Sequence, residues 1–367
     1  MQEIATLLEW IDIESPTSHR AGVNAMMDLV QDEGRRGGLA AERVAGTDGM
    51  GDMLLLRAGP HLDGPGVLVV AHLDTVHPCG TKDAGLPIRI DGDRLYGPGA
   101  YDMKGGAWIA LEAIKEIERT KSASRPVAFL LTPDEEVGSP TSRKLIEDLA
   151  RRSSAVLVVE PARNNGSCVT GRKGVGRFDV EIEGREAHAG LNHELGRSAV
   201  SEAARQILHI EAMTDYERGV TATVGLISGG SALNVIPRKT SFSVDLRIAT
   251  MADAGIFEER IRGLKPHGPD IRLSVTGGIN RPPMERTPAG VALYEKARLL
   301  AEEIGFALPE QTLSGGGSDG NFTAALGVPT LDGLGVDGDG AHTMREHVLI
   351  SSINPRRKLL VRLLQTL

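Results

Sequence analysis

Three short segments in the first half of the chain are apolar at every position, and they constrain the fold more than any other feature. They are residues 66–71, 126–131 and 155–159. Short unbroken apolar runs are typical of strands that are buried on both faces, as in a parallel sheet covered by helices. Between the first two runs, apolar residues recur at helical spacing from Ala107 to Ile117. The first half therefore predicts an α/β domain with a central, mostly parallel sheet flanked by helices.

The middle of the chain has a different pattern. Apolar and polar residues alternate around 178–182, 242–248 and 271–275, as in strands with one solvated face. Helical stretches are expected near 196–213 and 251–264. The order strand-helix-strand-strand-helix-strand predicts a ferredoxin-like α+β domain.

The length of 367 residues exceeds what a single core commonly holds, so we expect two domains. The α/β domain is expected in residues 1–173 and 284–367, where the α/β pattern begins and returns. The ferredoxin-like domain is expected as an insertion, residues 174–283.

The composition excludes some classes of partner. The net charge of −8 argues against nucleic-acid binding, which usually needs a basic face. No apolar stretch has the roughly 20 residues of a membrane helix, and the N-terminus lacks the pattern of a signal peptide. Only Cys79 and Cys168 are present, which indicates free thiols and no disulfide framework. We therefore expect a cytoplasmic protein that binds neither nucleic acid nor membranes.

Potential metal ligands follow the three apolar runs. His72 follows the first run, Glu135 and Glu136 follow the second, and Glu160 follows the third, while Asp102 precedes the predicted helix. In open α/β sheets the carboxyl ends of the strands form the ligand-binding edge. Histidine and carboxylates without cysteine suit zinc, manganese or cobalt. Two metal ions fit this set if one carboxylate bridges them, and such a pair activates water for hydrolysis.

Each of these motifs alone is weak evidence, but their order along the chain is specific. With them, the sequence resembles the co-catalytic zinc peptidases that include carboxypeptidase G, aminoacylase, acetylornithine deacetylase and succinyl-diaminopimelate desuccinylase. The resemblance covers nearly the whole chain and is closest to the carboxypeptidase G branch. The segments that carry it are residues 72–76, 99–106, 134–139, 160–161, 184–190 and 315–319.

The resemblance implies the metal ligands. Asp102 would bridge two divalent ions, most often Zn²⁺, with Co²⁺ or Mn²⁺ as alternatives. His72 and Glu160 would complete one site, and Glu136 and His342 would complete the other. The neighbouring His347 is then expected at the surface.

The resemblance also implies the catalytic residues. Glu135 would be the general base, and Asp74 would hydrogen-bond His72 and fix its tautomer. His188 would reach the active site of a partner subunit and stabilise the oxyanion, so a homodimer through residues 174–283 is implied. The peptide bond that follows Asp102 would be cis.

Four further residues are implied to contact the substrate. Asn234 and Arg247 match the pair that binds the substrate carboxylate, a task for which the planar fork of arginine is suited. Gly316 and Ser318 lie in the loop expected to line the substrate pocket.

The expected function is hydrolysis of an amide or peptide bond next to a free carboxylate, as in carboxypeptidase G, which releases a C-terminal amino acid such as glutamate. An N-acyl-amino-acid deacylase or a dipeptidase of the same family stays open as an alternative. A non-catalytic dimeric binding protein is a distant alternative, since such a protein would be expected to lack a ligand or Glu135.

Overall fold

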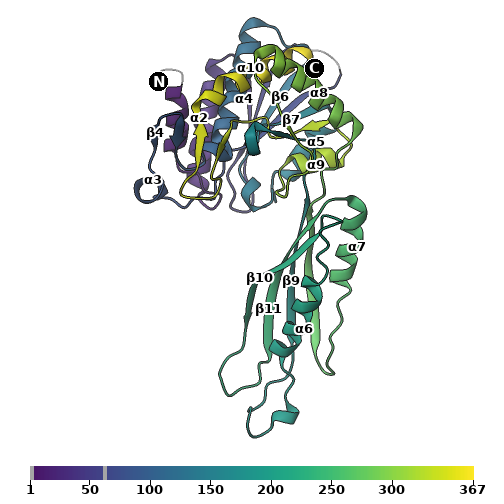
Figure 1. The fold of residues 1–367 in the computed structure, drawn as a ribbon. Coiled ribbons are helices and arrows are strands. Elements are labelled where there is room, and N and C mark those ends of the chain that lie inside the picture. The colour runs from purple at the N-terminus through teal and green to yellow at the C-terminus, as the bar shows by residue number, and fades with distance from the viewer. Residues whose placement is uncertain (1–3, 61–63) are drawn as a thin grey trace. The chain divides into compact units, whose positions relative to one another are not determined.

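The computed structural model describes residues 4–60 and 64–367. The chain packs as two compact units, and the second is an insertion in the sequence of the first (Figure 1). Paired backbone hydrogen bonds between Arg172 and Met284 join the entering and leaving segments of unit 2. Unit 1 comprises Met1–Gly171, Arg286–Ser314 and Ser318–Leu367, and unit 2 comprises Arg172–Glu285 and Gly315–Gly317.

Unit 1 is built around a six-stranded sheet. The three apolar runs form its parallel centre, which confirms the predicted α/β class. Antiparallel strands extend one edge, and a short parallel strand extends the other. In order across the sheet, the strands are β1 (Ala40–Val44), β2 (Met53–Ala58), β6 (Val127–Thr132), β3 (Gly66–His72), β7 (Ser153–Val158) and β14 (Thr330–Leu331).

The central strands are apolar throughout because both faces of the sheet are covered. In β3, Val67 and Val69 belong to one hydrophobic core, whereas Leu68 and Val70 belong to the other. Alternate residues of a strand point to opposite faces, so a strand between two layers needs apolar residues at every position. The larger core includes α1 (Ala5–Asp12), α2 (Arg20–Arg36), α4 (Gly105–Thr120), α8 (Pro288–Ile304) and α10 (Ile350–Thr366), and the smaller includes α5 (Arg143–Ala150) and α9 (Gly320–Ala325).

Unit 1 also contains short strands outside the main sheet. A four-stranded sheet has the order β15 (Gly338–Asp339), β16 (His347–Leu349), β5 (Arg94–Tyr96) and β4 (Arg89–Asp91). Two further strands of two residues each, β8 (Cys168–Val169) and β13 (Glu310–Gln311), pair in parallel.

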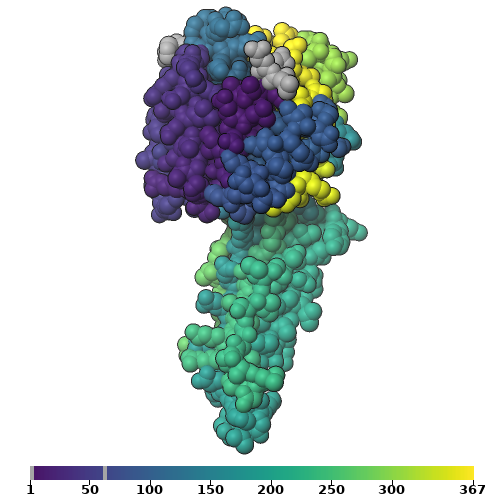
Figure 2. Space-filling model, turned by 90° about the vertical axis from the view of Figure 1, so that its left-hand side faces the viewer, coloured from purple at the N-terminus to yellow at the C-terminus, as the bar shows by residue number. Residues whose placement is uncertain are grey.

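The segment after β3 is held against the N-terminal helix region. Glu14 accepts hydrogen bonds from the backbone N–H groups of Gly80 and Lys82, and Lys82 forms an ion pair with Asp12. Helix α3 (Thr81–Ala84) lies in this segment. Figure 2 shows the purple N-terminal residues beside blue residues on this surface. These contacts fix a loop that begins directly after His72.

Unit 2 has the predicted ferredoxin-like arrangement. Its antiparallel sheet has the order β10-β11-β9-β12, and both helices cover one face (Figure 1). The side chains of Ser198 and Thr250 accept backbone hydrogen bonds and cap the two helices. The elements are β9 (Gly174–Glu183), α6 (Ala199–Glu211), β10 (Thr221–Gly229), β11 (Lys239–Ile248), α7 (Met251–Arg262) and β12 (Arg272–Arg281).

Within residues 4–60 and 64–367, no helix is both long enough and apolar enough to cross a membrane. Cys79 and Cys168 are both free thiols, as expected.

Candidate metal centre

The ends of three strands bring the first candidate residues together. β3 lies between β6 and β7, and the three strands are parallel, so their carboxyl ends meet at one edge. β3 ends at His72, Glu160 lies two residues beyond β7, and the turn Glu135–Val137 follows β6. The turn Ala100–Lys104, in which Asp102 and Met103 have non-helical backbone angles, carries Asp102 directly before α4.

The two carboxylate oxygens of Asp102 face different partners. Oδ1 lies 3.2 Å from Nε2 of His72, and this nitrogen lies 3.7 Å from Oε1 of Glu160. Oδ2 lies 3.4 Å from Nε2 of His342, and this nitrogen lies 3.3 Å from Oε2 of Glu136. The cluster therefore has two halves, each with one histidine and one glutamate, joined by a single carboxylate.

The donor atoms of this cluster suit divalent cations. Ligand atoms of His72, Asp102 and Glu136 lie within 4.8 Å of one another, and so do those of His72, Glu135 and Glu160. Imidazole nitrogens and carboxylate oxygens are ligands that zinc, manganese and cobalt accept. Among the described residues, buried Oε1 of Glu136 has no hydrogen-bond partner. A buried carboxylate oxygen without a partner is costly, and a bound cation would satisfy it, so the residues fit metal ions.

The cluster carries more negative charge than its two imidazoles balance. Hydrogen bonds that His342 donates to the carboxylates of Asp102 and Glu136 raise the pKa of His342 to about 10. Burial disfavours the Asp102 carboxylate, but hydrogen bonds from His342 and His72 outweigh burial and hold its pKa well below the usual range. Burial raises the pKa of Glu136. The site therefore favours added positive charge, which divalent cations would supply.

Asp74 lies behind the cluster and holds the turn that follows β6. Its carboxylate accepts hydrogen bonds from the backbone N–H groups of Glu135 and Glu136 at 3.1 and 3.2 Å, and from the Thr17 hydroxyl at 2.7 Å. The predicted hydrogen bond between Asp74 and His72 is present, but its acceptor is the main-chain oxygen of Asp74 rather than the carboxylate. Nδ1 of His72 lies 2.9 Å from the main-chain oxygen of Asp74 and 3.5 Å from its carboxylate.

Sequence reasoning missed Glu346, which holds the turn that carries Asp102. Its fully buried carboxylate accepts hydrogen bonds from the backbone N–H groups of Tyr101 and Asp102, both at 2.9 Å, and of Gly99 at 3.2 Å. Nε2 of His77 lies 2.6 Å from the same carboxylate. One glutamate therefore joins three segments, those that contain His77, Asp102 and His342. Its only sequence signal is an acid four residues after His342.

One expectation about this region is confirmed, and the position of His347 differs from the expected one because its side chain is half-buried rather than exposed. The peptide bond between Asp102 and Met103 is cis. His347 lies in β16, where its Nδ1 donates a hydrogen bond to the main-chain oxygen of Arg345, and it makes no contact with the cluster among the contacts described.

One expected catalytic residue, His188, and one expected substrate-binding residue, Asn234, lie together in unit 2. His188 is exposed, and its Nδ1 accepts hydrogen bonds from the backbone N–H groups of Gly190 and Leu191. The main-chain oxygen of Asn234 accepts a bond from Ala189, so Asn234 lies beside this loop. Because Nδ1 is an acceptor, the proton of neutral His188 is on Nε2, which leaves Nε2 as a donor.

The remaining substrate candidates have partners within the protein. Arg247 forms a two-pronged ion pair with Asp245, with nitrogen–oxygen distances of 2.6 and 2.8 Å. The main-chain oxygen of Gly316 accepts a hydrogen bond from Arg172. Ser318 is fully buried, its N–H group bonds to Asn321, and its hydroxyl bonds to Asp332. The structure thus gives Ser318 a role in loop geometry that the sequence did not predict.

The sequence of this chain matches the profile of one protein family. The profile described as peptidase family M20/M25/M40 matches residues 68–366. Carboxypeptidase G2 from a Pseudomonas species is 30% identical over 99% of this chain and 89% of its own length. Succinyl-diaminopimelate desuccinylase from Delftia acidovorans is 28% identical over 97% of this chain and 96% of its own length.

Solved structures show the same fold over the whole chain. Aminopeptidase PepT from Bacillus cereus has a TM-score of 0.79 at 21% identity and covers 100% of this chain and 98% of its own. The M20 family metallo-carboxypeptidase Sso-CP2 from Sulfolobus solfataricus has a TM-score of 0.79 at 16% identity and covers 100% and 99%. The predicted α/β peptidase fold is therefore confirmed.

Glu346→Ala should destabilise unit 1. The substitution removes the acceptor of three buried N–H groups, and each unsatisfied group costs about 1–3 kcal/mol, so we expect a loss of about 3 kcal/mol or more in the free energy of unfolding. Glu346→Gln keeps one acceptor oxygen and should lose less. Urea denaturation measures both, with Glu9→Ala on the exposed face of α1 as the control. A Glu346→Ala curve that matches the Glu9→Ala curve would contradict the role given to Glu346.

Proposed function

Because the chain belongs to peptidase family M20/M25/M40 and is therefore a hydrolase of the metallopeptidase type, we propose that it is a two-zinc enzyme that cleaves an amide bond next to a free carboxylate. The observation that carries this proposal is the arrangement around Asp102. Its two oxygens face separate histidine–glutamate pairs, which is the ligand set that two neighbouring cations need. Co²⁺ or Mn²⁺ would fit the same donors.

Each half of the cluster would hold one ion. His72 and Glu160 would bind the first, Glu136 and His342 the second, and Asp102 would bind both. Bound divalent cations would supply Lewis acidity toward the substrate carbonyl and the attacking water.

Glu135 is the proposed general base. It follows β6 beside Glu136, and its ligand atom lies within 4.8 Å of those of His72 and Glu160. The hydrogen bond from its backbone N–H to Asp74 fixes the turn that carries it. From this position its carboxylate would take a proton from the attacking water and give it to the leaving amine.

His188 and Arg247 are proposed to act on the substrate from unit 2. Nε2 of His188 is the free donor of that ring and suits an oxyanion, which is stabilised by donors already in place. Arg247 already holds the Asp245 carboxylate in a two-pronged geometry, and a substrate carboxylate would take the place of Asp245 with Asn234 as a second contact. Gly316 would line the substrate pocket.

The substrate class is proposed as a carboxypeptidase G-like one, with release of a C-terminal amino acid such as glutamate. Carboxypeptidase G2 is the relative that matches most of this chain among those named above. The desuccinylase and an acetylornithine deacetylase from Myxococcus xanthus, 33% identical over 66% of both chains, support the alternative of an N-acyl-amino-acid deacylase. A dipeptidase stays a further alternative.

Unit 2 is the proposed dimerisation domain, with limits near residues 174 and 283. β10 is an edge strand of its sheet, and it exposes Leu226 and Ile227, whose side chains are 71% and 59% exposed. An exposed edge strand with apolar residues is a template for pairing with a second copy.

Leu226→Arg should therefore shift a homodimer toward monomer, because it places a charge on the pairing edge. Analytical ultracentrifugation measures the change, with Leu299→Arg on an exposed position of unit 1 as the control. A wild-type protein that is monomeric and fully active would contradict the proposal of a shared active site.

Metal content tests the two-ion proposal. Zinc-loaded protein, freed of excess metal, should contain two ions per chain by elemental analysis. His342→Ala should retain one, because it removes a ligand of only one half. His347→Ala should retain two, since His347 bonds to Arg345 in β16. A single ion in the wild-type protein would contradict the proposal.

The substrate class is tested with matched compounds. We expect the highest rate of cleavage for glutamate conjugates, a lower rate for N-acyl amino acids and the lowest rate for dipeptides. Each should lose about tenfold or more in kcat/KM when the free carboxylate becomes a carboxamide, because a hydrogen bond to a charged group is worth about 1.5–3 kcal/mol.

Glu135→Gln serves as the matched catalytic control for this panel. It should retain both metal ions and lower kcat by about 10²–10⁴-fold, the usual contribution of a general base. Glu9→Gln, an exposed glutamate on α1, should keep the wild-type rate. Cleavage that persists in Glu135→Gln would assign the base elsewhere.

A further inference from the structure

A large cavity in unit 1 borders three of the segments that carry the proposed metal ligands. Its volume is about 1160 Å³, and it is lined by Tyr101, Arg163 and Thr343, among others. These residues are adjacent or close in sequence to Asp102, Glu160 and His342 respectively. The hydroxyl of Tyr101 donates a hydrogen bond to the main-chain oxygen of Ala162, which joins two of the segments. The cavity wall is therefore built from the same turns as the metal centre.

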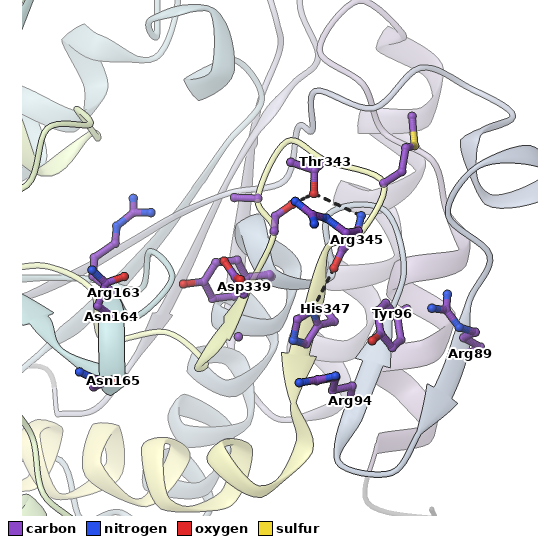
Figure 3. Close-up of a pocket in the computed structure, with 15 residues that line it drawn as sticks. Arg89, Arg94, Tyr96, Arg163, Asn164, Asn165, Asp339, Thr343, Arg345 and His347 are labelled. Atoms are coloured by element: carbon purple, nitrogen blue, oxygen red, sulfur yellow. Dashed lines mark hydrogen bonds between the residues drawn. The ribbon is translucent and has the colours of Figure 1, made fainter.

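One wall of the cavity is a face of the small four-stranded sheet. Arg89, Tyr96, His347 and Asp339 are direct neighbours across its four strands. The Arg89 guanidinium lies 3.7 Å from the centre of the Tyr96 ring, and the Tyr96 and His347 rings are 5.1 Å apart. Figure 3 shows Tyr96, Arg94 and His347 on one side of the cavity and Arg163 on the other.

The lining has an excess of positive charge. It contains four arginines but only one carboxylate, that of Asp339. Within the described ranges 4–60 and 64–367, none of the four guanidinium groups lies within 4.0 Å of a carboxylate, although most arginines named in the contacts of this chain form ion pairs. The chain as a whole carries a net charge of −8, so this concentration is local. The four are Arg89, Arg94, Arg163 and Arg345.

Two of these arginines, Arg163 and Arg345, differ in their surroundings at the cavity. Arg163 is half-buried, and its Nε atom is buried with no hydrogen-bond partner among the described residues. The backbone N–H of Arg345 bonds to the Thr343 hydroxyl, and its carbonyl oxygen accepts a bond from His347 (Figure 3). One unsatisfied buried donor and three further guanidinium groups around the same cavity indicate a site for an anion, since arginine binds carboxylates through paired, charge-assisted hydrogen bonds.

We propose that this cavity binds a carboxylate on the acyl side of the substrate, away from the amino acid that is released. The proposal rests on the proposed hydrolase function. The carboxylate of the amino-acid part is assigned there to Arg247 of unit 2, so a second anion-binding surface in unit 1 serves the other part of the molecule. The preferred substrates would then be amides of dicarboxylic acids, or peptides with an acidic residue before the cleaved bond.

Two acyl groups that differ only in charge test this proposal. N-succinyl and N-succinamoyl derivatives of the same amino acid have the same shape, but the second carries a neutral carboxamide in place of the carboxylate. The wild-type enzyme should favour the N-succinyl compound by about tenfold or more in kcat/KM, as expected for a charge-assisted bond. The double variant Arg163→Gln/Arg345→Gln should reduce this ratio to near one. Arg35→Gln, an exposed arginine on α2, should leave both rates at the wild-type value.

A binding measurement separates this proposal from the proposed function. Calorimetry with zinc-loaded Glu135→Gln protein should show tighter binding of the N-succinyl compound, and the added changes at Arg163 and Arg345 should remove the difference. If neither compound is hydrolysed but binding still depends on charge and on these arginines, the cavity proposal stands and the hydrolase proposal fails. Equal affinities for the N-succinyl and N-succinamoyl compounds would overturn the cavity proposal. Inorganic phosphate that binds through Arg163, with equal binding of the two acyl compounds, would also overturn it, because the cavity would then serve a free anion.

Discussion

The buried carboxylate of Asp102 is the group on which the arrangement of unit 1 depends. Its oxygens face His72 and His342, and its own backbone N–H is bonded to Glu346. Several acidic side chains share this edge of the sheet, where burial disfavours the negative charges of Asp102 and Glu136. The surrounding hydrogen bonds therefore act mainly on position: Asp74 holds the turn after β6, and Glu346 holds the turn before α4. These hydrogen bonds, formed on folding, offset part of the repulsion between the neighbouring carboxylates.

The sequence predicted the part of this arrangement that follows from strand direction. Unbroken apolar runs indicate strands buried on both faces, parallel strands share one carboxyl edge, and so His72, Glu135, Glu136 and Glu160 had to converge. The alternating pattern in the middle of the chain predicted the ferredoxin-like unit by the same argument. Alternate residues of a strand point to opposite faces, so apolar residues at every second position indicate a sheet that is covered on one face only.

The sequence could not predict polar contacts between distant segments, because no hydrophobic periodicity marks the residues that make them. Glu346 bonds to Gly99 and His77 across more than two hundred positions, and nothing in the local pattern separates it from a solvated glutamate. Ser318 was expected at the substrate, but its polar atoms close the loop that contains it. Hydrophobic periodicity fixes which face of an element is buried, whereas the partner of a polar side chain depends on tertiary packing.

The ion pair of Arg247 with Asp245 has a consequence for how tightly a carboxylate can be held at that position. Both residues lie on β11, so the arginine is never without a counter-charge. A carboxylate that binds there exchanges one ion pair for another of similar geometry, so the net gain in binding free energy is smaller than at an arginine without a counter-charge. A ligand that lacks a carboxylate finds the guanidinium already satisfied. If Arg247 takes the substrate carboxylate as proposed, the competing Asp245 carboxylate lowers the affinity for substrate and product alike, so a released amino acid would leave that position readily.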